Sequence, residues 1–135
     1  MHIRRGRLLY LSSFDVTSLG VVRRRVLRHL HLAGLSGFRA DGFLLAVAEI
    51  LANAVEHGGG SGMIELRHDG DRLDCEICDE GPGLRPGAHG THLAASTDER
   101  GRGLRLAHML CDQVLHHRVA TGTRITLTIA ITPAA

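Results

Sequence analysis

Apolar positions recur every three or four residues in three stretches of the chain, and this spacing predicts three amphipathic α-helices. Asp15, Thr17 and Ser18 precede the first stretch and are suitable N-cap residues. Consecutive glycines after His57 are expected to stop the second helix. The expected helices run from this N-cap region to about Leu32, from about Asp41 to Glu56, and from about Gly103 to Leu115.

Other segments alternate apolar and polar residues, which is the pattern of β-strands with one buried face. Two of them flank Asp69-Gly70-Asp71, a hairpin turn signal. Helices mixed with hairpins predict an α/β fold, a two-layer α/β sandwich whose mixed, mostly antiparallel sheet is covered on one face by about three helices. The expected strands are Leu8–Ser12, Met63–His68, Arg72–Cys78, His116–Ala120 and Thr123–Ile131.

Length and composition narrow the class of protein. A chain of 135 residues suits one core, so we expect residues 1–135 to form a single domain. No apolar run approaches the roughly 18 residues that span a bilayer, and no signal-peptide pattern follows Met1, so we expect a cytoplasmic protein without membrane contact. A net charge of +2 and 3% aromatic residues argue against direct nucleic-acid binding.

All sixteen basic residues are arginines. The absence of lysine excludes a Walker-A phosphate loop, a eukaryotic-type kinase site and Schiff-base chemistry, each of which needs a lysine amine. Any phosphate must therefore be bound by backbone N–H groups, arginine or a metal. Arg23-Arg24-Arg25 and Arg28 are concentrated on the first expected helix. They form either a solvated helix face or a docking surface for an acidic partner.

The three cysteines do not indicate a disulfide framework. Cys75 and Cys78 match C-x-x-C, but they lie on an expected strand, where this spacing points the two sulfurs to opposite faces. The ten histidines are scattered and lack the spacing of a zinc site. We therefore expect neither a redox pair nor a zinc site.

A polar stripe marks the second expected helix. Glu49, Asn53 and His57 are four residues apart and share one helix face. Asn53 is the only asparagine of the chain and lies inside a helix, where asparagine is a mediocre former. A neutral oxygen one turn from a carboxylate suits hydrated Mg²⁺. The alternative is an ordinary polar helix edge.

A carboxylate and two glycines follow the third expected strand. Asp79 continues the parity of Leu73, Cys75 and Ile77, which places it on the core side, where it needs hydrogen-bond donors. Gly81 and Gly83 permit a close approach that a Cβ would block. An amino group on an adenine ring would be a suitable donor, and an ordinary turn is the alternative.

Two further signals lie near the C-terminus. Gly101-Arg102-Gly103-Leu104 opens the third expected helix, where free N–H groups bind anions and Arg100 adds charge. Thr123 shares the parity of Ile125 and later residues, so its hydroxyl is expected in the same layer as Asp79. Ordinary helix starts and plain β-propensity are the alternatives.

The order and separation of these motifs resemble the GHKL ATPase family over roughly residues 8–131. The stretch from Glu49 to Gly58 is most similar to the branch of bacterial anti-sigma-factor serine/threonine kinases. The resemblance implies that Glu49 is the general base and Asn53 the Mg²⁺ ligand. It also implies that Asp79 accepts a hydrogen bond from the adenine amino group.

The resemblance assigns the remaining motifs to the same ATP site and segment 85–100 to a mobile ATP lid. The residues expected to bind nucleotide are Asn53, His57, Asp79, Gly81, Gly83, Arg100, Gly101, Arg102, Gly103, Leu104 and Thr123. The implied activity is phosphorylation of a small STAS-type anti-sigma-factor antagonist, sequestration of a sigma factor, or both. A nucleotide-binding regulatory module without kinase activity and a detached histidine-kinase catalytic domain remain alternatives. The family also suggests a homodimer.

Overall fold

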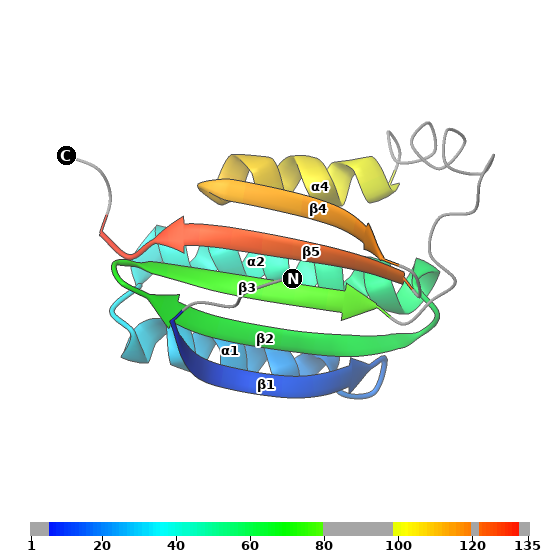
Figure 1. Ribbon diagram of the computed structural model, residues 1–135, viewed down its shortest axis with the longest axis horizontal. Helices are drawn as coiled ribbons and strands as arrows, with labels where there is room; N and C mark the ends of the chain where they lie inside the picture. Colours follow the sequence, from blue (N-terminus) through cyan, green and yellow to red (C-terminus); the bar gives the residue numbers. More distant parts are fainter. Residues whose placement is uncertain (1–5, 80–98, 120–121, 133–135) are drawn as a thin grey trace.

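The computed structural model describes residues 6–79, 99–119 and 122–132, except for the side chains of residues 99–103. This part of the chain forms five strands and three helices, which are labelled in Figure 1. No described helix is long and apolar enough to cross a membrane. The elements are β1 (Arg7–Asp15), α1 (Leu19–Leu32), α2 (Gly37–His57), β2 (Ser61–Asp69), β3 (Arg72–Asp79), α4 (Glu99–Leu110), β4 (Gln113–Val119) and β5 (Gly122–Ala130).

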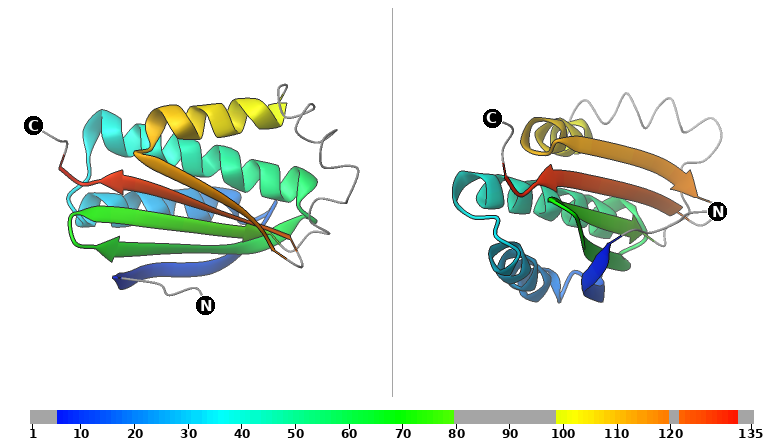
Figure 2. Two further views of the ribbon diagram at one scale, coloured as in Figure 1. Left: turned by 45° about the horizontal axis from the view of Figure 1, so that its top comes forward. Right: turned by 60° about the vertical axis from the view of Figure 1, so that its left-hand side comes forward.

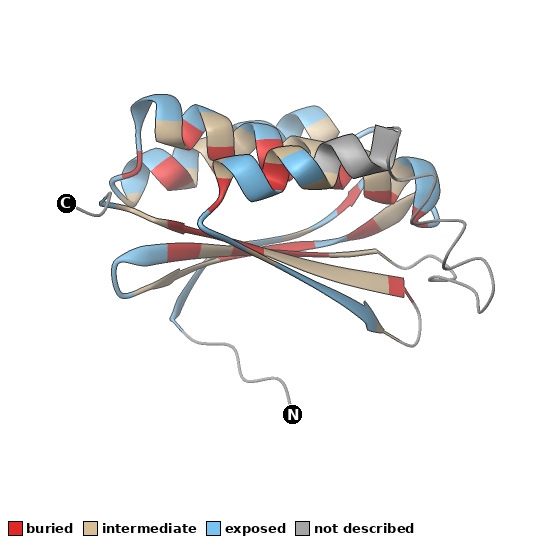
Figure 3. Ribbon diagram, turned by 90° about the horizontal axis from the view of Figure 1, so that it is seen from above, coloured by how far each residue is buried: buried red, intermediate tan, exposed pale blue. Residues whose placement is uncertain are grey.

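The strands form one sheet in the order β1-β2-β3-β5-β4, and all four pairings are antiparallel. The helices lie together on one face of this sheet, as Figure 2 and the edge-on view of Figure 3 show. Within their layer α2 is central and contacts both α1 and α4. The two-layer α/β sandwich predicted from the sequence is therefore confirmed.

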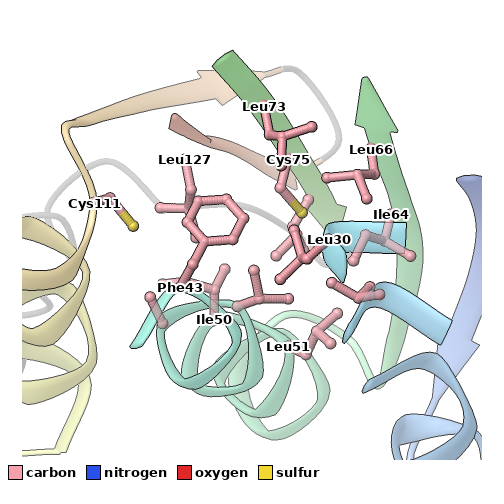
Figure 4. Packing of buried hydrophobic residues seen from close by; sticks show 14 of the residues in the cluster. Leu30, Phe43, Ile50, Leu51, Ile64, Leu66, Leu73, Cys75, Cys111 and Leu127 are labelled. Carbon is pink, nitrogen blue, oxygen red and sulfur yellow. The ribbon is translucent and has the colours of Figure 1, made fainter. Parts of the chain in front are cut away.

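The core lies between the two layers, because each strand directs alternate side chains toward the helices. Leu73, Cys75 and Ile77 of β3 are buried there against Phe43 and Ile50 of α2. Figure 4 shows Phe43 and Leu127 meeting between α2 and the sheet. Burial of each large apolar side chain contributes about 1.5–3 kcal/mol.

The cysteines follow the predicted parity. Cys75 is fully buried on the helix side of the sheet. Cys78 is half-buried on the opposite face, where its thiol donates to the Glu76 carboxylate at 3.6 Å. Burial raises the pKa of the Cys75 thiol far above its ordinary value and raises the pKa of Cys111 to about 12. All three thiols are free, and no redox pair is formed by the described cysteines.

The third expected helix was misplaced. We expected it from Gly103 to Leu115, but α4 begins at Glu99 and ends at Leu110, and Val114 belongs to β4. The chain turns at Asp112, whose N–H donates to the Thr128 carbonyl at 2.8 Å and whose carboxylate accepts from the Ala130 N–H at 2.6 Å. These bonds to β5 start the edge strand β4 directly after Asp112. The apolar spacing alone is equally compatible with another turn of α4 at these positions.

A glycine in α2 sets the spacing of α2 and α4. A Cβ built at Gly42 would lie 3.1 Å from Cδ2 of Leu110, which is tighter than an ordinary contact. The backbone of α2 therefore packs directly against the last turn of α4. At the same end of the molecule, the Arg39 guanidinium donates to the Ala130 carbonyl and ties the beginning of α2 to the end of β5.

Candidate functional site

Four element ends converge at one end of the sandwich. The C-terminal ends of α2 and β3, the beginning of β5 and the first turn of α4 lie at the right of Figure 1. The left view of Figure 2 shows the α2 and α4 ends at this same side. Residues from distant parts of the sequence therefore meet there.

Asp79 is the last residue of β3 and is half-buried at this end. Its carboxylate oxygen Oδ1 accepts a hydrogen bond from the backbone N–H of Thr123 at 3.2 Å. The sequence predicted that these two residues share a layer, and the structure brings them together. The contact runs through the Thr123 backbone, whereas the prediction concerned the hydroxyl.

Two glycines enclose the Asp79 side chain. A Cβ at Gly58, the residue after α2, would lie 2.6 Å from both Cγ and Oδ2 of Asp79. A Cβ at Gly122 would lie 2.2 Å from the Asp79 carbonyl oxygen and 2.6 Å from Oδ1. Real Cβ atoms do not come this close, so both positions require glycine for packing alone.

Gly58 is the site residue that sequence reasoning missed. The glycines after His57 predict a helix stop, and the structure confirms it, since the Gly58 N–H donates to the Ala54 carbonyl at 2.8 Å at the end of α2. Its second role depends on a contact with β3. One glycine is enough to end a helix, but three follow His57. This excess of glycine is the signal in the sequence that could have indicated a second role for Gly58.

Glu49 and Asn53 are both half-buried on one side of α2. They follow Gly42 by seven and eleven residues, which at 100° per residue places all three on one helix face. Because Gly42 packs against Leu110, this is the side of α2 that faces α4. Neither side chain forms a hydrogen bond or ion pair with another residue that the structure describes.

His57 ends α2, and its Nε2 lies 3.4 Å from the Glu56 carboxylate. Its side chain is 37% exposed, so it lies nearer the surface than Asn53 one turn earlier. Leu104 is half-buried and packs against the hydrophobic core. The structure gives both residues a local structural role, and their predicted contacts with nucleotide remain predictions.

The start of α4 differs from the expected motif. Gly101 and Gly103 were expected to open the helix, but they lie inside it, because α4 begins at Glu99. The first four N–H groups of a helix have no partner within it, and Gly101 is among them. The helix start remains a position that favours anions. Gly81, Gly83, most of the expected lid 85–100 and the Arg100 and Arg102 side chains lie outside the described residues.

The described residues around the candidate site offer few ligands for a metal ion. In the described part of the chain, no group of three or more histidine, cysteine, aspartate or glutamate residues could hold an ion. The Asn53 side chain nevertheless fits Mg²⁺, which takes oxygen ligands and commonly keeps one or two protein groups alongside water and phosphate. Asn53 supplies an oxygen of the kind this role needs, and its contact with Mg²⁺ remains a prediction.

Comparisons with known proteins agree with the observed fold. The family model described as histidine kinase-like ATPase domain matches residues 13–129. No curated protein sequence was found to match the chain. Among solved structures, the RsbU and RsbW domains of Rv1364c from Mycobacterium tuberculosis align with a TM-score of 0.65 at 21% identity, over 90% of this chain and 32% of that one.

Two histidine kinases also share the fold. The histidine kinase domain of a blue-light activated histidine kinase from Erythrobacter litoralis has a TM-score of 0.53 at 21% identity, covering 84% of this chain and 61% of that one. Acinetobacter baumannii AdeS has a TM-score of 0.56 at 12% identity, covering 93% and 69%. The chain thus spans less than two thirds of the first two structures.

Proposed function

Because this chain belongs to the family of histidine kinase-like ATPase domains, we propose that it binds ATP with Mg²⁺ and transfers the γ-phosphate to a serine or threonine of a partner protein. The observation that carries the proposal is the Asp79 carboxylate, fixed by the Thr123 N–H between Gly58 and Gly122. A carboxylate held this way is a directed acceptor for the exocyclic amino group of adenine.

The rest of the site follows from the orientation of α2. With the base at Asp79, the triphosphate extends between α2 and α4, toward the face that carries Glu49 and Asn53. Asn53 would hold Mg²⁺, which when bound neutralises phosphate charge. The N–H groups at the start of α4 bind the phosphate oxygens.

Glu49 acts as the general base. Its carboxylate takes the proton of the acceptor hydroxyl while that oxygen bonds to the γ-phosphorus. The bond from the γ-phosphorus to the bridging oxygen breaks, and ADP leaves with the electron pair. No lysine is required, in agreement with a chain that has none.

The proposed partner is a small STAS-type antagonist of an anti-sigma factor, a sigma factor, or both. It rests on the resemblance of the Glu49–Gly58 stretch to the anti-sigma-factor kinase branch. Histidine phosphorylation is the second candidate, since two of the structural relatives are histidine kinases. The two activities leave different products, because phosphoserine survives acid and phosphohistidine does not.

The test is transfer of labelled γ-phosphate to purified candidate partners, followed by acid treatment. Glu49→Ala is expected to lower the transfer rate by about 10²–10⁴-fold, the usual contribution of a general base, while ATP affinity changes little. Asp71→Ala, which removes an exposed carboxylate in the turn between β2 and β3, is the control. Parental transfer by Glu49→Ala would rule out the assigned role. Nucleotide binding without transfer to any partner would favour a purely regulatory module.

A further inference from the structure

The outer surface of α2 carries large apolar side chains that the described part of the fold leaves fully or partly exposed. Phe38 is 97% exposed and Leu45 is 46% exposed, and they lie seven residues apart, two turns along one face. Met109 of α4 is 78% exposed, next to the Leu110 that packs on Gly42. The three side chains are therefore grouped around the α2–α4 contact.

Basic side chains flank this apolar group on one side. Arg24 and Arg28 lie one turn apart on α1, opposite the buried Val22 and Val26, and both are exposed together with Arg25. The sequence of α1 contains no acidic residue. None of these three arginines forms an ion pair with a residue in the described ranges.

The other side is basic as well. Arg105 of α4 is exposed one turn before Met109. Since α2 lies between α1 and α4, its apolar side chains form a central strip with arginines on both borders. Figure 3 shows exposed residues at intervals along the helices, among intermediate and buried ones. We name this surface the helix-layer strip, formed by Phe38, Leu45 and Met109 with Arg24, Arg25, Arg28 and Arg105.

The arrangement matches one kind of partner. An amphipathic helix places apolar residues in a stripe and charges on both flanks, and two turns of such a helix span the distance of about 10 Å between Phe38 and Leu45. Acidic flanks would complement the arginines. A continuous polyanion fits less well, because exposed Asp41 lies within the strip between Phe38 and Leu45.

We propose that the helix-layer strip docks an acidic amphipathic helix of a partner protein. The apolar side chains anchor the partner helix, and the arginines select for acidic flanks and fix its direction. This docking requires neither nucleotide nor phosphotransfer. It can therefore be tested independently of the proposed activity.

The test uses a fluorescein-labelled synthetic 20-residue amphipathic helix with leucine anchors and glutamate flanks, titrated with the full chain without nucleotide. We expect saturable binding that Phe38→Ser weakens by about tenfold, as truncation of an exposed aromatic anchor does. The double variant Arg24→Glu, Arg28→Glu is expected to weaken it at least as much, mainly at low salt.

Two controls keep the result specific. Leu11→Ser alters an exposed apolar residue on the sheet face away from the helices and should leave binding unchanged. Circular dichroism should show the parental fold for Phe38→Ser, since this side chain is almost fully exposed. Absence of saturable binding would refute the proposal. So would equal binding of a lysine-flanked peptide, or preferential binding to vesicles of anionic lipid.

Discussion

The two halves of the candidate site are built differently. Around Asp79, the backbones of Gly58 and Gly122 approach the aspartate so closely that neither position has room for a Cβ. Around Glu49 and Asn53, half-buried side chains project from one helix without a hydrogen bond to other described residues. The first half is fixed by packing, whereas no hydrogen bond with another described residue fixes the side chains of the second half.

This difference predicts which substitutions lower the stability of the fold and which affect only ligand binding or phosphotransfer. Changes near Asp79 disturb the contacts among α2, β3 and β5 and therefore act on folding and binding together. Changes at Glu49 or Asn53 remove a polar group from a helix surface and therefore act on the ligand while the fold persists. The following substitutions test this division, in order of decreasing effect.

Gly58→Ala should have the largest effect, because it is expected to lower both the stability of the fold and the affinity for nucleotide. The new Cβ would lie 2.6 Å from the Asp79 carboxyl carbon, and overpacking of this kind costs about 1–3 kcal/mol. We expect a lower free energy of unfolding in a denaturant titration and weaker nucleotide binding. Gly20→Ala is the control, because its Cβ meets only the Arg24 guanidinium at 3.5 Å. Equal stability of Gly58→Ala and the parent would show that the packed half is not rigid.

Asp79→Asn should reduce nucleotide affinity by about 10-fold to 100-fold, because a hydrogen bond to a charged group contributes about 1.5–3 kcal/mol. Isothermal titration calorimetry with ATP and ADP measures the loss, which should be the same for both nucleotides if Asp79 contacts the base. Asp71→Asn, in the exposed turn between β2 and β3, serves as the reference. Unchanged affinity for both nucleotides would place the base elsewhere.

Asn53→Ala should have a smaller effect that depends on the metal. We expect ATP binding to weaken by about tenfold with Mg²⁺, equivalent to about 1.4 kcal/mol, and hardly at all in EDTA. Thermal denaturation measures this, because a ligand at one hundred times its Kd stabilises the native state by about 2.7 kcal/mol. The same loss in EDTA would mean that Asn53 contacts the nucleotide directly and does not bind metal.

The sequence predicted the layers and the central helix well, because local periodicity decides them. Phe43, Val47 and Ile50 repeat at helical spacing, and all three are buried. The alternation of Leu73, Cys75 and Ile77 predicts Asp79 on the helix side of the sheet, and its close approach to Gly58 at the end of α2 agrees. These features depend only on neighbours along the chain.

Features that depend on tertiary contacts could not be predicted in this way. Val114 fits the apolar spacing of α4 as well as that of a strand, and the bonds between Asp112 and β5 decide between them. Glycines at 101 and 103 suggested a helix boundary, but each costs only about 1 kcal/mol inside a helix, so α4 continues past them. The close approach of Gly58 to Asp79 has no local signature.

The contact between Gly42 and Leu110 has a mechanical consequence. It acts as a pivot at one end of α4, while Gly101, near the other end, lies about 13 Å away along the helix axis. A bulkier residue at position 42 would push the two helices apart at the pivot and swing the far end of α4 through a larger arc. The orientation of the first turn of α4, where we propose that phosphate binds, would thus depend on a residue outside the proposed site. Alanine or serine at position 42 offers a way to change that orientation from a distance.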